Sequence, residues 1–291
     1  MARLEARGPP AVHVTQEEVR RLCEFLYRRT GMSFADNKRY YVDRRLAERI
    51  VATKSESFQS YFAILRSDVG HEIEHLVNAF TVNETYFYRE EHQLRCMTSN
   101  LLDNVIRAKK PGESIRIWSI PCSTGEEPYS IAIWLMENWR QVDSYNIEIV
   151  GSDIDTRALK AAADGVYGDR ALARLSGDVI ARYFQKVEGN SYRIDPGLRD
   201  SIQFTRANLI DASEMALYRS FDIVFCRNVL IYFDDSSRRI AAENLYDCLH
   251  PSGYICLGHS ETMSRISPLF RVCRFSDAIV YQKPEAGRDR E

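Results

Sequence analysis

The segment 115–139 constrains the fold of this chain most, because it predicts a strand, a tight loop and a helix in direct succession. It begins with an apolar run around Trp118, which indicates a buried strand. A loop of small residues follows at 119–125, and Glu126-Glu127-Pro128 then opens a helix, where a first-turn proline is tolerated. In α/β enzymes such a unit holds a nucleotide-like ligand at the carboxyl end of the sheet.

The loop differs from the usual dinucleotide-binding pattern. Of G-x-G-x-x-G only Gly125 is present, and the carboxylates of Glu126 and Glu127 would repel a pyrophosphate at the helix start. A ligand with a cationic or hydroxylated end fits better, and S-adenosylmethionine carries a sulfonium, an ammonium and a ribose without phosphate. From the spacing alone, a plain turn in an ordinary strand–helix unit is an equally good interpretation.

Composition and charge are those of an ordinary soluble protein of 291 residues with a net charge of −2. A charge so close to neutral argues against bulk affinity for nucleic acid. The seven cysteines, an odd number without a C-x-x-C pair, predict reduced thiols in a cytoplasm rather than a disulfide framework or a zinc site. Neither a signal peptide nor a run of about 20 apolar residues for a membrane span is indicated.

The first 80 residues predict an all-helical domain behind a loose tail at 1–12. Thr15 and Glu18 form a capping-box pattern at the start of the first helix, and Gly31 is a plausible end. Further helices are expected at 36–51, 58–65 and 72–80.

Two features of this domain suggest more than packing. Lys38, Arg45 and Arg49 project together from the second helix, either as a merely solvated face or as a docking surface for an acidic partner. The sequence HEIEH at 71–75 is a literal H-E-x-x-H, which can bind zinc with Glu72 as general base. No third ligand follows in this short polar segment, so a solvated acidic helix with two chance histidines is favoured.

Beyond the central segment, strands and helices alternate, which predicts an α/β fold with a mainly parallel sheet. The strand Ile147–Gly151 leads to Asp153, the position where such folds hold ribose hydroxyls, whereas Asp155 is explained as a helix cap. A strand at 202–207 leads to Asn208, whose amide could hold an adenine, although asparagine at a strand end is usually turn chemistry.

The carboxyl-terminal part predicts a hairpin at 183–194 and a strongly apolar strand at 221–226. The polar residues Arg227 and Asn228 that follow this strand need partners or a ligand. The remaining expected elements are a helix at 235–249, a strand at 254–258, an antiparallel pair at 270–275 and 278–282, and a disordered tail after 284.

Five motifs stand together in this chain: NETYFYR (83–89), STGEEPYS (123–130), SDIDT (152–156), FDIVFCRNVLIYF (221–233) and GHSET (258–262). In this order they closely resemble the chemotaxis receptor methyltransferases, the CheR family, over about residues 15–283. The resemblance implies an all-α N-terminal domain and a Rossmann-like S-adenosylmethionine-dependent methyltransferase domain with a small β-subdomain. The implied boundaries are 1–80 for the helical domain, 81–112 for a linker and helix carrying NETYFYR, 113–284 for the methyltransferase domain, about 183–201 for the β-subdomain, and 285–291 for the tail.

The resemblance also implies an activity and a site. The family methylates glutamate side chains of chemoreceptors to glutamyl methyl esters, in the cytoplasm. The implied cofactor contacts are Asn83, Thr85, Arg89, Glu127, Asp153, Asn208, Leu209, Asn228 and Val229. Arg89 and Tyr232 take the catalytic places beside the transferring methyl. One departure is Pro121-Cys122, where the family commonly has small residues.

The implied partner is the helical cytoplasmic region of receptors, bound by a monomer that uses no metal, nucleic acid or membrane insertion. Lys38, Arg45 and Arg49 are the expected docking face for this acidic partner. Some family members also bind a receptor's terminal peptide on the β-subdomain, by adding it to a sheet edge. The turn at 187–191 is short here, which argues against that second contact.

The chemistry agrees with these residue types, because a glutamate carboxylate with a pKa of about 4.3 is already a nucleophile at neutral pH. Catalysis then depends on alignment and on exclusion of water. Arg89 can hold the carboxylate of either cofactor or substrate. Two alternatives remain. The first is a small-molecule or nucleic-acid methyltransferase, although R-N-V-L at 227–230 stands where adenine-methylating enzymes have [DN]-P-P-[YF]. The second is a non-catalytic S-adenosylmethionine-binding regulator, which the presence of both Arg89 and Tyr232 argues against.

Overall fold

A computed structural model of the chain describes residues 14–285 and divides the chain into two compact units, Met1–Val82 and Asn83–Glu291. The tails expected at 1–12 and 285–291 lie outside the described residues, apart from Glu285. All seven cysteines are free thiols. Within the described part, no helix combines the length and the apolar character that crossing a bilayer requires.

The amino-terminal unit is an assembly of α-helices whose apolar faces meet in one core. The helices are α1 Gln16–Thr30, α2 Arg39–Ala52, α3 Phe58–Ser67 and α4 Glu72–Phe80, with 3-10 turns at Asp36–Lys38 and Val69–His71. The predicted capping box of Thr15 and Glu18 is present, and α1 ends at Gly31 with φ 72°. Every fourth residue of α2 is buried, namely Val42, Leu46 and Ile50, which is the apolar stripe expected of a core-facing helix.

One carboxylate is buried within this unit. Glu72 is 3% exposed and receives two hydrogen bonds from the guanidinium of Arg49, at 2.6 and 2.9 Å, and one from the Tyr61 hydroxyl at 2.8 Å. Helix α4 begins at Glu72, and His71 precedes it in the left-handed region with φ 58°. The two histidines of HEIEH therefore do not share a helix face, and the Glu72 carboxylate is occupied by Arg49 and Tyr61. Among the described residues, no group of three or more His, Cys, Asp or Glu is placed to hold a metal ion.

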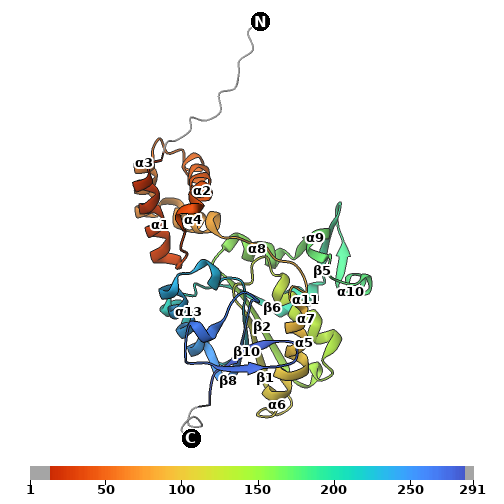
Figure 1. The fold of residues 1–291 in the computed structure, drawn as a ribbon. Coiled ribbons are helices and arrows are strands. Elements are labelled where there is room, and N and C mark those ends of the chain that lie inside the picture. The colour runs from red at the N-terminus through yellow and green to blue at the C-terminus, as the bar shows by residue number, and fades with distance from the viewer. Residues whose placement is uncertain (1–13, 286–291) are drawn as a thin grey trace. The chain divides into compact units, whose positions relative to one another are not determined.

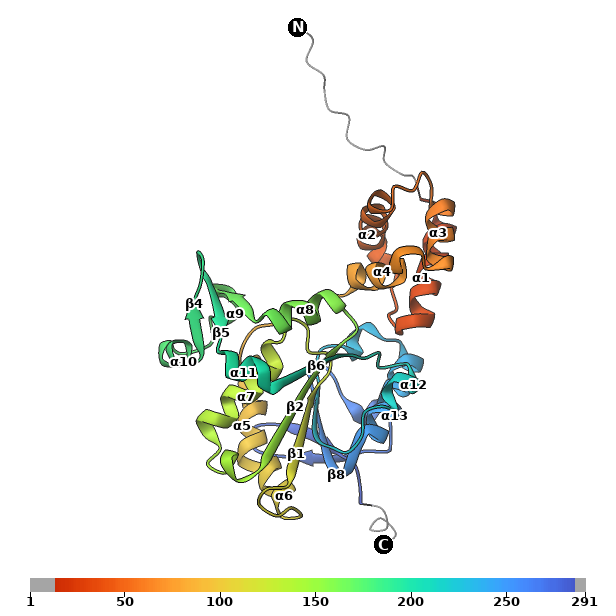
Figure 2. The same cartoon turned by 180° about the vertical axis from the view of Figure 1, so that it is seen from behind.

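The second unit is built on a seven-stranded sheet in the order β6-β2-β1-β7-β8-β10-β9. The five strands from β6 to β8 are parallel, and β10 and β9 add an antiparallel edge (Figures 1 and 2). The predicted Rossmann-like sheet is confirmed. The strands are β1 Ser114–Ser119, β2 Asn146–Asp153, β6 Ile202–Arg206, β7 Phe221–Cys226, β8 Leu249–Leu257, β9 Arg271–Arg274 and β10 Ile279–Gln282.

Helices cover both faces of this sheet, with α5 and α7 on one side and α12 and α13 on the other (Figures 1 and 2). All six residues of β7 are buried, as expected for a central strand covered on both faces. The helices are α5 Glu91–Cys96, a π-helical segment Met97–Leu101, α6 Leu102–Ile106, α7 Glu126–Asn138, α8 Thr156–Asp164, α11 Pro196–Ser201, α12 Ala212–Met215 and α13 Asp235–Cys248.

A small antiparallel sheet in the order β3-β5-β4 forms the β-subdomain. The hairpin predicted from the sequence is β4 Phe184–Lys186 and β5 Ser191–Ile194. A third strand, β3 Val166–Gly168, pairs with β5 and was not predicted, so the subdomain starts earlier than residue 183. Two short helices, α9 Asp169–Leu172 and α10 Gly177–Tyr183, lie between β3 and β4.

Candidate functional site

A buried carboxylate ends strand β2 at the carboxyl edge of the sheet. Asp153 is 3% exposed, and its two oxygens accept hydrogen bonds from the backbone N–H groups of Ser123 and Asp155, each at 2.8 Å. Burial raises the pKa of Asp153 to about 6, because desolvation outweighs the two N–H donors that favour the ionised form. The carboxylate is thus held in place by the loop after β1 while its charge remains poorly solvated.

Asn83, the first residue of NETYFYR, is hydrogen-bonded to residues next to Asp153. The Asn83 amide donates to Asp155 at 2.8 Å and accepts from the Ser123 hydroxyl at 3.1 Å. Asp155 also caps α8 by accepting from the N–H groups of Arg157 and Ala158, as the sequence predicted. Asn83 therefore lies where the loops after β1 and β2 meet.

A second buried network joins α7 to the end of β7. Arg227 places two guanidinium nitrogens 2.5 Å from Oε2 of Glu127, and the Ser119 hydroxyl donates to Oε1 at 2.7 Å. The exposed side-chain fractions are 4% for Arg227 and 10% for Glu127. A third nitrogen of Arg227 donates to the backbone oxygen of Arg89 at 2.8 Å, so NETYFYR is also fixed at its end. Oε1 of Glu127 accepts from Ser119 alone and keeps a second lone pair with which it can accept from an ammonium.

A third carboxylate, which the sequence did not single out, organises the loops after β7 and β8. Glu261 accepts hydrogen bonds from the backbone N–H groups of Asn228 at 2.8 Å, Leu230 at 2.8 Å and Gly258 at 2.9 Å. Burial raises its pKa despite these donors. The only sequence signal was its position in GHSET, directly after the apolar strand β8.

The other predicted site residues lie on the same edge or on loops that reach it. Asn208 and Leu209 are buried beyond β6, whose following residue Ala207 donates to the Asp153 backbone oxygen at 3.1 Å. The Arg89 guanidinium donates to the Glu84 backbone oxygen at 2.7 Å. Thr85 lies in the same segment, Val229 lies in the loop after β7, and Tyr232 ends the 3-10 turn Leu230–Tyr232 with 37% of its surface exposed.

This arrangement fits a hydroxylated, cationic ligand. The edge offers a buried aspartate, a buried glutamate and side-chain amides, whereas the buried guanidinium of Arg227 is neutralised by Glu127. Ribose hydroxyls can donate to Asp153, and an amino-acid ammonium can donate to Glu127. A pyrophosphate would instead face the carboxylates of Asp153 and Glu127. The donor set therefore fits S-adenosylmethionine, as expected from the loop sequence.

The raised pKa of Asp153 predicts a pH dependence of cofactor affinity. Hydroxyl donors favour the ionised carboxylate, so affinity for S-adenosylhomocysteine should rise as the pH increases from 5 to 7 and level off above that. Titration calorimetry across this range measures the effect, and Asp153→Asn should remove the step and weaken binding by about 1–3 kcal/mol. A pH-independent affinity in the unmodified protein would place Asp153 outside the site.

The stability of the ligand-free protein should depend on pH in the opposite direction and fall as the pH rises. Because the folded-state pKa of Asp153 lies above its usual 3.8, the contribution of this group is fully present below about pH 4 and is lost as the pH rises through 6. Ionised Asp153 thus lowers the stability of the ligand-free protein at neutral pH.

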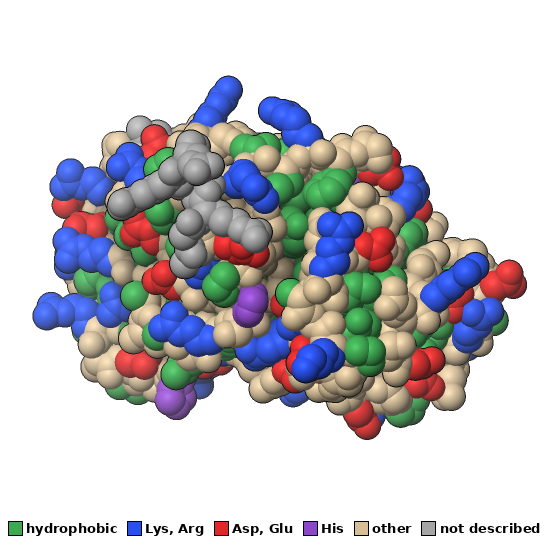
Figure 3. Space-filling view, turned by 90° about the horizontal axis from the view of Figure 1, so that it is seen from below, with side chains coloured by type: hydrophobic (Ala, Val, Ile, Leu, Met, Phe, Trp, Pro, Cys, Tyr) green, Lys and Arg blue, Asp and Glu red, His purple; other side chains and the backbone are tan. Residues whose placement is uncertain are grey.

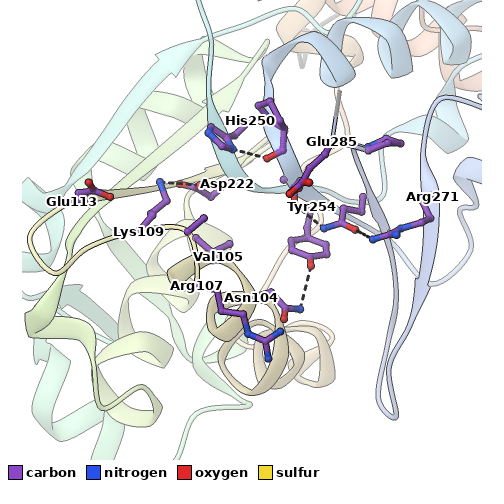
Figure 4. A pocket seen from close by; sticks show the side chains of 16 residues that line it. Asn104, Val105, Arg107, Lys109, Glu113, Asp222, His250, Tyr254, Arg271 and Glu285 are labelled. Carbon is purple, nitrogen blue, oxygen red and sulfur yellow. Dashed lines mark hydrogen bonds and ion pairs between the residues drawn. The ribbon is translucent and has the colours of Figure 1, made fainter. Parts of the chain in front are cut away.

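A larger hollow lies at the opposite ends of the strands and is separate from this edge. It has a volume of about 950 Å³ and is lined by Arg107, Lys109 and His250 among others (Figure 4). Lys109 is paired with the buried Asp222 at 3.0 Å, near the start of β7. Seen from the side of α6, acidic and basic side chains are interspersed on the surface (Figure 3). The hollow carries no excess of one charge, because its lining has equal numbers of basic and acidic residues, namely Arg107, Lys109, Arg271, Glu113, Asp222 and Glu285.

Comparison with known proteins identifies related sequences along nearly the whole chain. The model "CheR methyltransferase, all-alpha domain" matches residues 17–81, and the model "CheR methyltransferase, SAM binding domain" matches residues 83–279. Chemotaxis protein methyltransferase 2 of Vibrio cholerae is 45% identical over 279 residues, which cover 96% of each chain. Chemotaxis protein methyltransferase 2 of Pseudomonas aeruginosa is 36% identical, covering 91% of this chain and 93% of the relative. The Salmonella typhimurium chemotaxis protein methyltransferase is 34% identical, covering 85% and 84%.

Proposed function

The chain belongs to the CheR methyltransferase family, and on that basis we propose that it methylates glutamate side chains of chemoreceptors to glutamyl methyl esters. The observation that best supports this proposal is the anchoring of NETYFYR at both ends. Asn83 is bonded to the loops after β1 and β2, and the Arg89 backbone is bonded to Arg227 beyond β7. The segment with the proposed catalytic Arg89 is thereby fixed to the cofactor edge.

The state of the carboxylates supports a substrate that is itself a carboxylate. Asp153, Glu127 and Glu261 each accept at least two hydrogen bonds, and Glu126 accepts one from Thr124 at 2.6 Å. Among the described residues of this edge, none of these groups is poised to remove a proton. An amine or alcohol nucleophile would need such a base, whereas an ionised glutamate does not.

The proposed roles follow from this chemistry. S-adenosylmethionine supplies a methyl group on a positively charged sulfur, and the reaction forms a carbon–oxygen bond as the carbon–sulfur bond breaks. Arg89 binds a carboxylate of the substrate or the cofactor, and Tyr232 donates a hydrogen bond to the substrate carboxylate. Asn83, Thr85, Asn208, Leu209, Asn228 and Val229 hold the cofactor with Glu127 and Asp153.

The test is one incubation with S-adenosylmethionine labelled on its methyl group. Receptor-rich membranes should acquire label that base treatment releases as methanol, because esters hydrolyse and N-methyl groups do not. Label that resists base, or label found on nucleic acid or a small molecule, would indicate the alternative methyltransferases. Cofactor binding without any transfer would indicate a regulator. We further propose a cytoplasmic monomer that acts on the helical cytoplasmic region of the receptor.

The proposed docking face of the helical unit needs one correction. Arg49 is not a free surface cation, because its side chain is 20% exposed and both its hydrogen bonds go to the buried Glu72. Arg45 pairs with Glu48 at 3.1 Å, and Lys38 is exposed and forms no ion pair with any side chain that the structure describes. We therefore keep Lys38 and Arg45 in the docking proposal and assign Arg49 to the core of the unit.

Reversing the charges of Lys38 and Arg45 to glutamate should lower kcat/KM for receptor methylation by about tenfold at low salt. The difference should shrink above about 0.5 M salt, where exposed charges are screened. The matched control reverses Lys54 and Arg66, two exposed cations of the same unit. Equal losses in both double variants would mean that only the net charge matters. Arg49 is unsuited to this test, because removing it leaves the Glu72 charge buried without its partner.

A further inference from the structure

A hollow of about 450 Å³, which we call the arginine groove, lies beside the cofactor edge of the second unit. Its walls are the first turns of α13 and the loops that follow β7 and β8. The residues that matter for the argument are Ile231, Asp235, Arg238, Arg239, Glu261 and Arg265.

The groove has an excess of positive charge. Its two acidic residues are occupied, since Asp235 pairs with Arg238 at 3.2 Å and the oxygens of Glu261 accept three backbone N–H groups. Arg239 and Arg265 are exposed, and neither forms an ion pair with any residue that the structure describes. Two guanidinium groups thus face the same hollow without a counter-charge.

The groove and the proposed catalytic residues share one loop. Asn228 and Val229 are proposed cofactor contacts, the next two residues line the groove, and Tyr232 follows directly. Glu261 lies in the groove wall and bonds to the N–H groups of both Asn228 and Leu230. Glu261 therefore fixes the backbone of this loop on both its cofactor side and its groove side, and Tyr232 follows the groove residue Ile231 directly in the chain.

We propose that the arginine groove binds acidic side chains that neighbour the methyl-accepting glutamate in the substrate protein. Guanidinium groups suit carboxylates because they donate two parallel hydrogen bonds. The side chain of Ile231, 46% exposed, offers an apolar contact at the same place. The groove then selects glutamates in acidic surroundings, a specificity that rests on the proposed function and adds a recognition element within the catalytic unit itself.

The test compares the wild type with Arg239→Glu/Arg265→Glu on a receptor fragment that carries an acidic methylation segment. We expect kcat/KM to fall by about tenfold or more through KM, with unchanged affinity for S-adenosylhomocysteine. A substrate whose flanking carboxylates are replaced by lysines should show the reverse preference and be methylated better by the variant than by the wild type.

The matched control is Arg107→Glu/Arg140→Glu, which makes the same charge change at two exposed arginines of the same unit outside the groove. It should leave kcat/KM within about twofold of the wild type. If the groove variant methylates both fragments as the wild type does, or if it loses cofactor affinity, the groove proposal is wrong while the proposed function stands. If the wild type itself leaves the acidic fragment unmethylated, both proposals fall.

Discussion

Replacing Arg227 with methionine should lower the free energy of unfolding of the catalytic unit by about 3–5 kcal/mol. The change removes the guanidinium that neutralises Glu127 and leaves that carboxylate buried without its charged partner. It also removes the donor to the Arg89 backbone oxygen, so NETYFYR loses its attachment beyond β7. Cofactor affinity and turnover should therefore fall even at temperatures where the variant remains folded.

Urea denaturation followed by tryptophan fluorescence measures this loss, because all three tryptophans belong to the catalytic unit. The control Arg140→Met, at an exposed position, should change stability by less than about 0.5 kcal/mol. The double variant Glu127→Gln/Arg227→Met should be more stable than Arg227→Met alone, because removing both charges destabilises the fold less than leaving one charge buried without its partner. If the double variant were as unstable as the sum of the single ones, the pair would not be coupled.

Tyr232→Phe should reduce turnover by roughly 10- to 150-fold, the equivalent of about 1.5–3 kcal/mol for a hydrogen bond to a charged group. The hydroxyl is proposed to act on the substrate carboxylate, so the affinity for S-adenosylhomocysteine should stay unchanged. The ring itself is retained, and the backbone N–H of Tyr232 still donates to Val229 at 3.0 Å. The 3-10 turn that positions this residue is thus preserved in the variant.

Single-turnover methyl transfer at saturating receptor fragment separates this effect from product release. Tyr145→Phe serves as the control, because that tyrosine lies just before β2 at the opposite end of the sheet. Turnover by Tyr232→Phe equal to that of Tyr145→Phe would reduce Tyr232 to a packing role. A parallel loss of cofactor affinity would instead indicate that Tyr232 contacts the cofactor and not the substrate.

Most of the fold was predictable from the sequence, because long segments with clear periodicity leave few alternatives. The every-fourth-residue stripe of α2 and the strongly apolar, fully buried strand β7 are such cases, and both were confirmed. The strand β3 was missed because its three residues, Val166–Gly168, are too few to show a period and are identified only by their pairing with β5. For the same reason, the predicted β-subdomain begins at about residue 183 and leaves out β3.

The site was less predictable, because its side chains are paired over long distances in sequence. The sequence indicated that Arg227 is a polar residue in a buried segment. Its partner Glu127 lies 100 residues away, and no local sequence pattern indicates that the two side chains form a pair. For Arg49, helical spacing predicted a face shared with Lys38 and Arg45, but not that Glu72, on another helix, would bind the guanidinium. Periodicity predicts on which face of a helix or strand a side chain lies, but it does not predict which side chain of another element will contact it.

Glu261 has a consequence for how this enzyme can change during evolution. One carboxylate bonds to the loop that carries Asn228, to Leu230 beside the groove and to Gly258 after β8. Given the proposed roles of Asn228 and of the arginine groove, a substitution at Glu261 should alter cofactor affinity and substrate preference together, which makes this position poorly suited to gradual adaptation. Arg239 and Arg265 have no such links among the described residues, so new substrate preferences can arise there while methyl-donor binding stays intact. Paralogues serving different receptors should accordingly differ at the two outer arginines and share the glutamate.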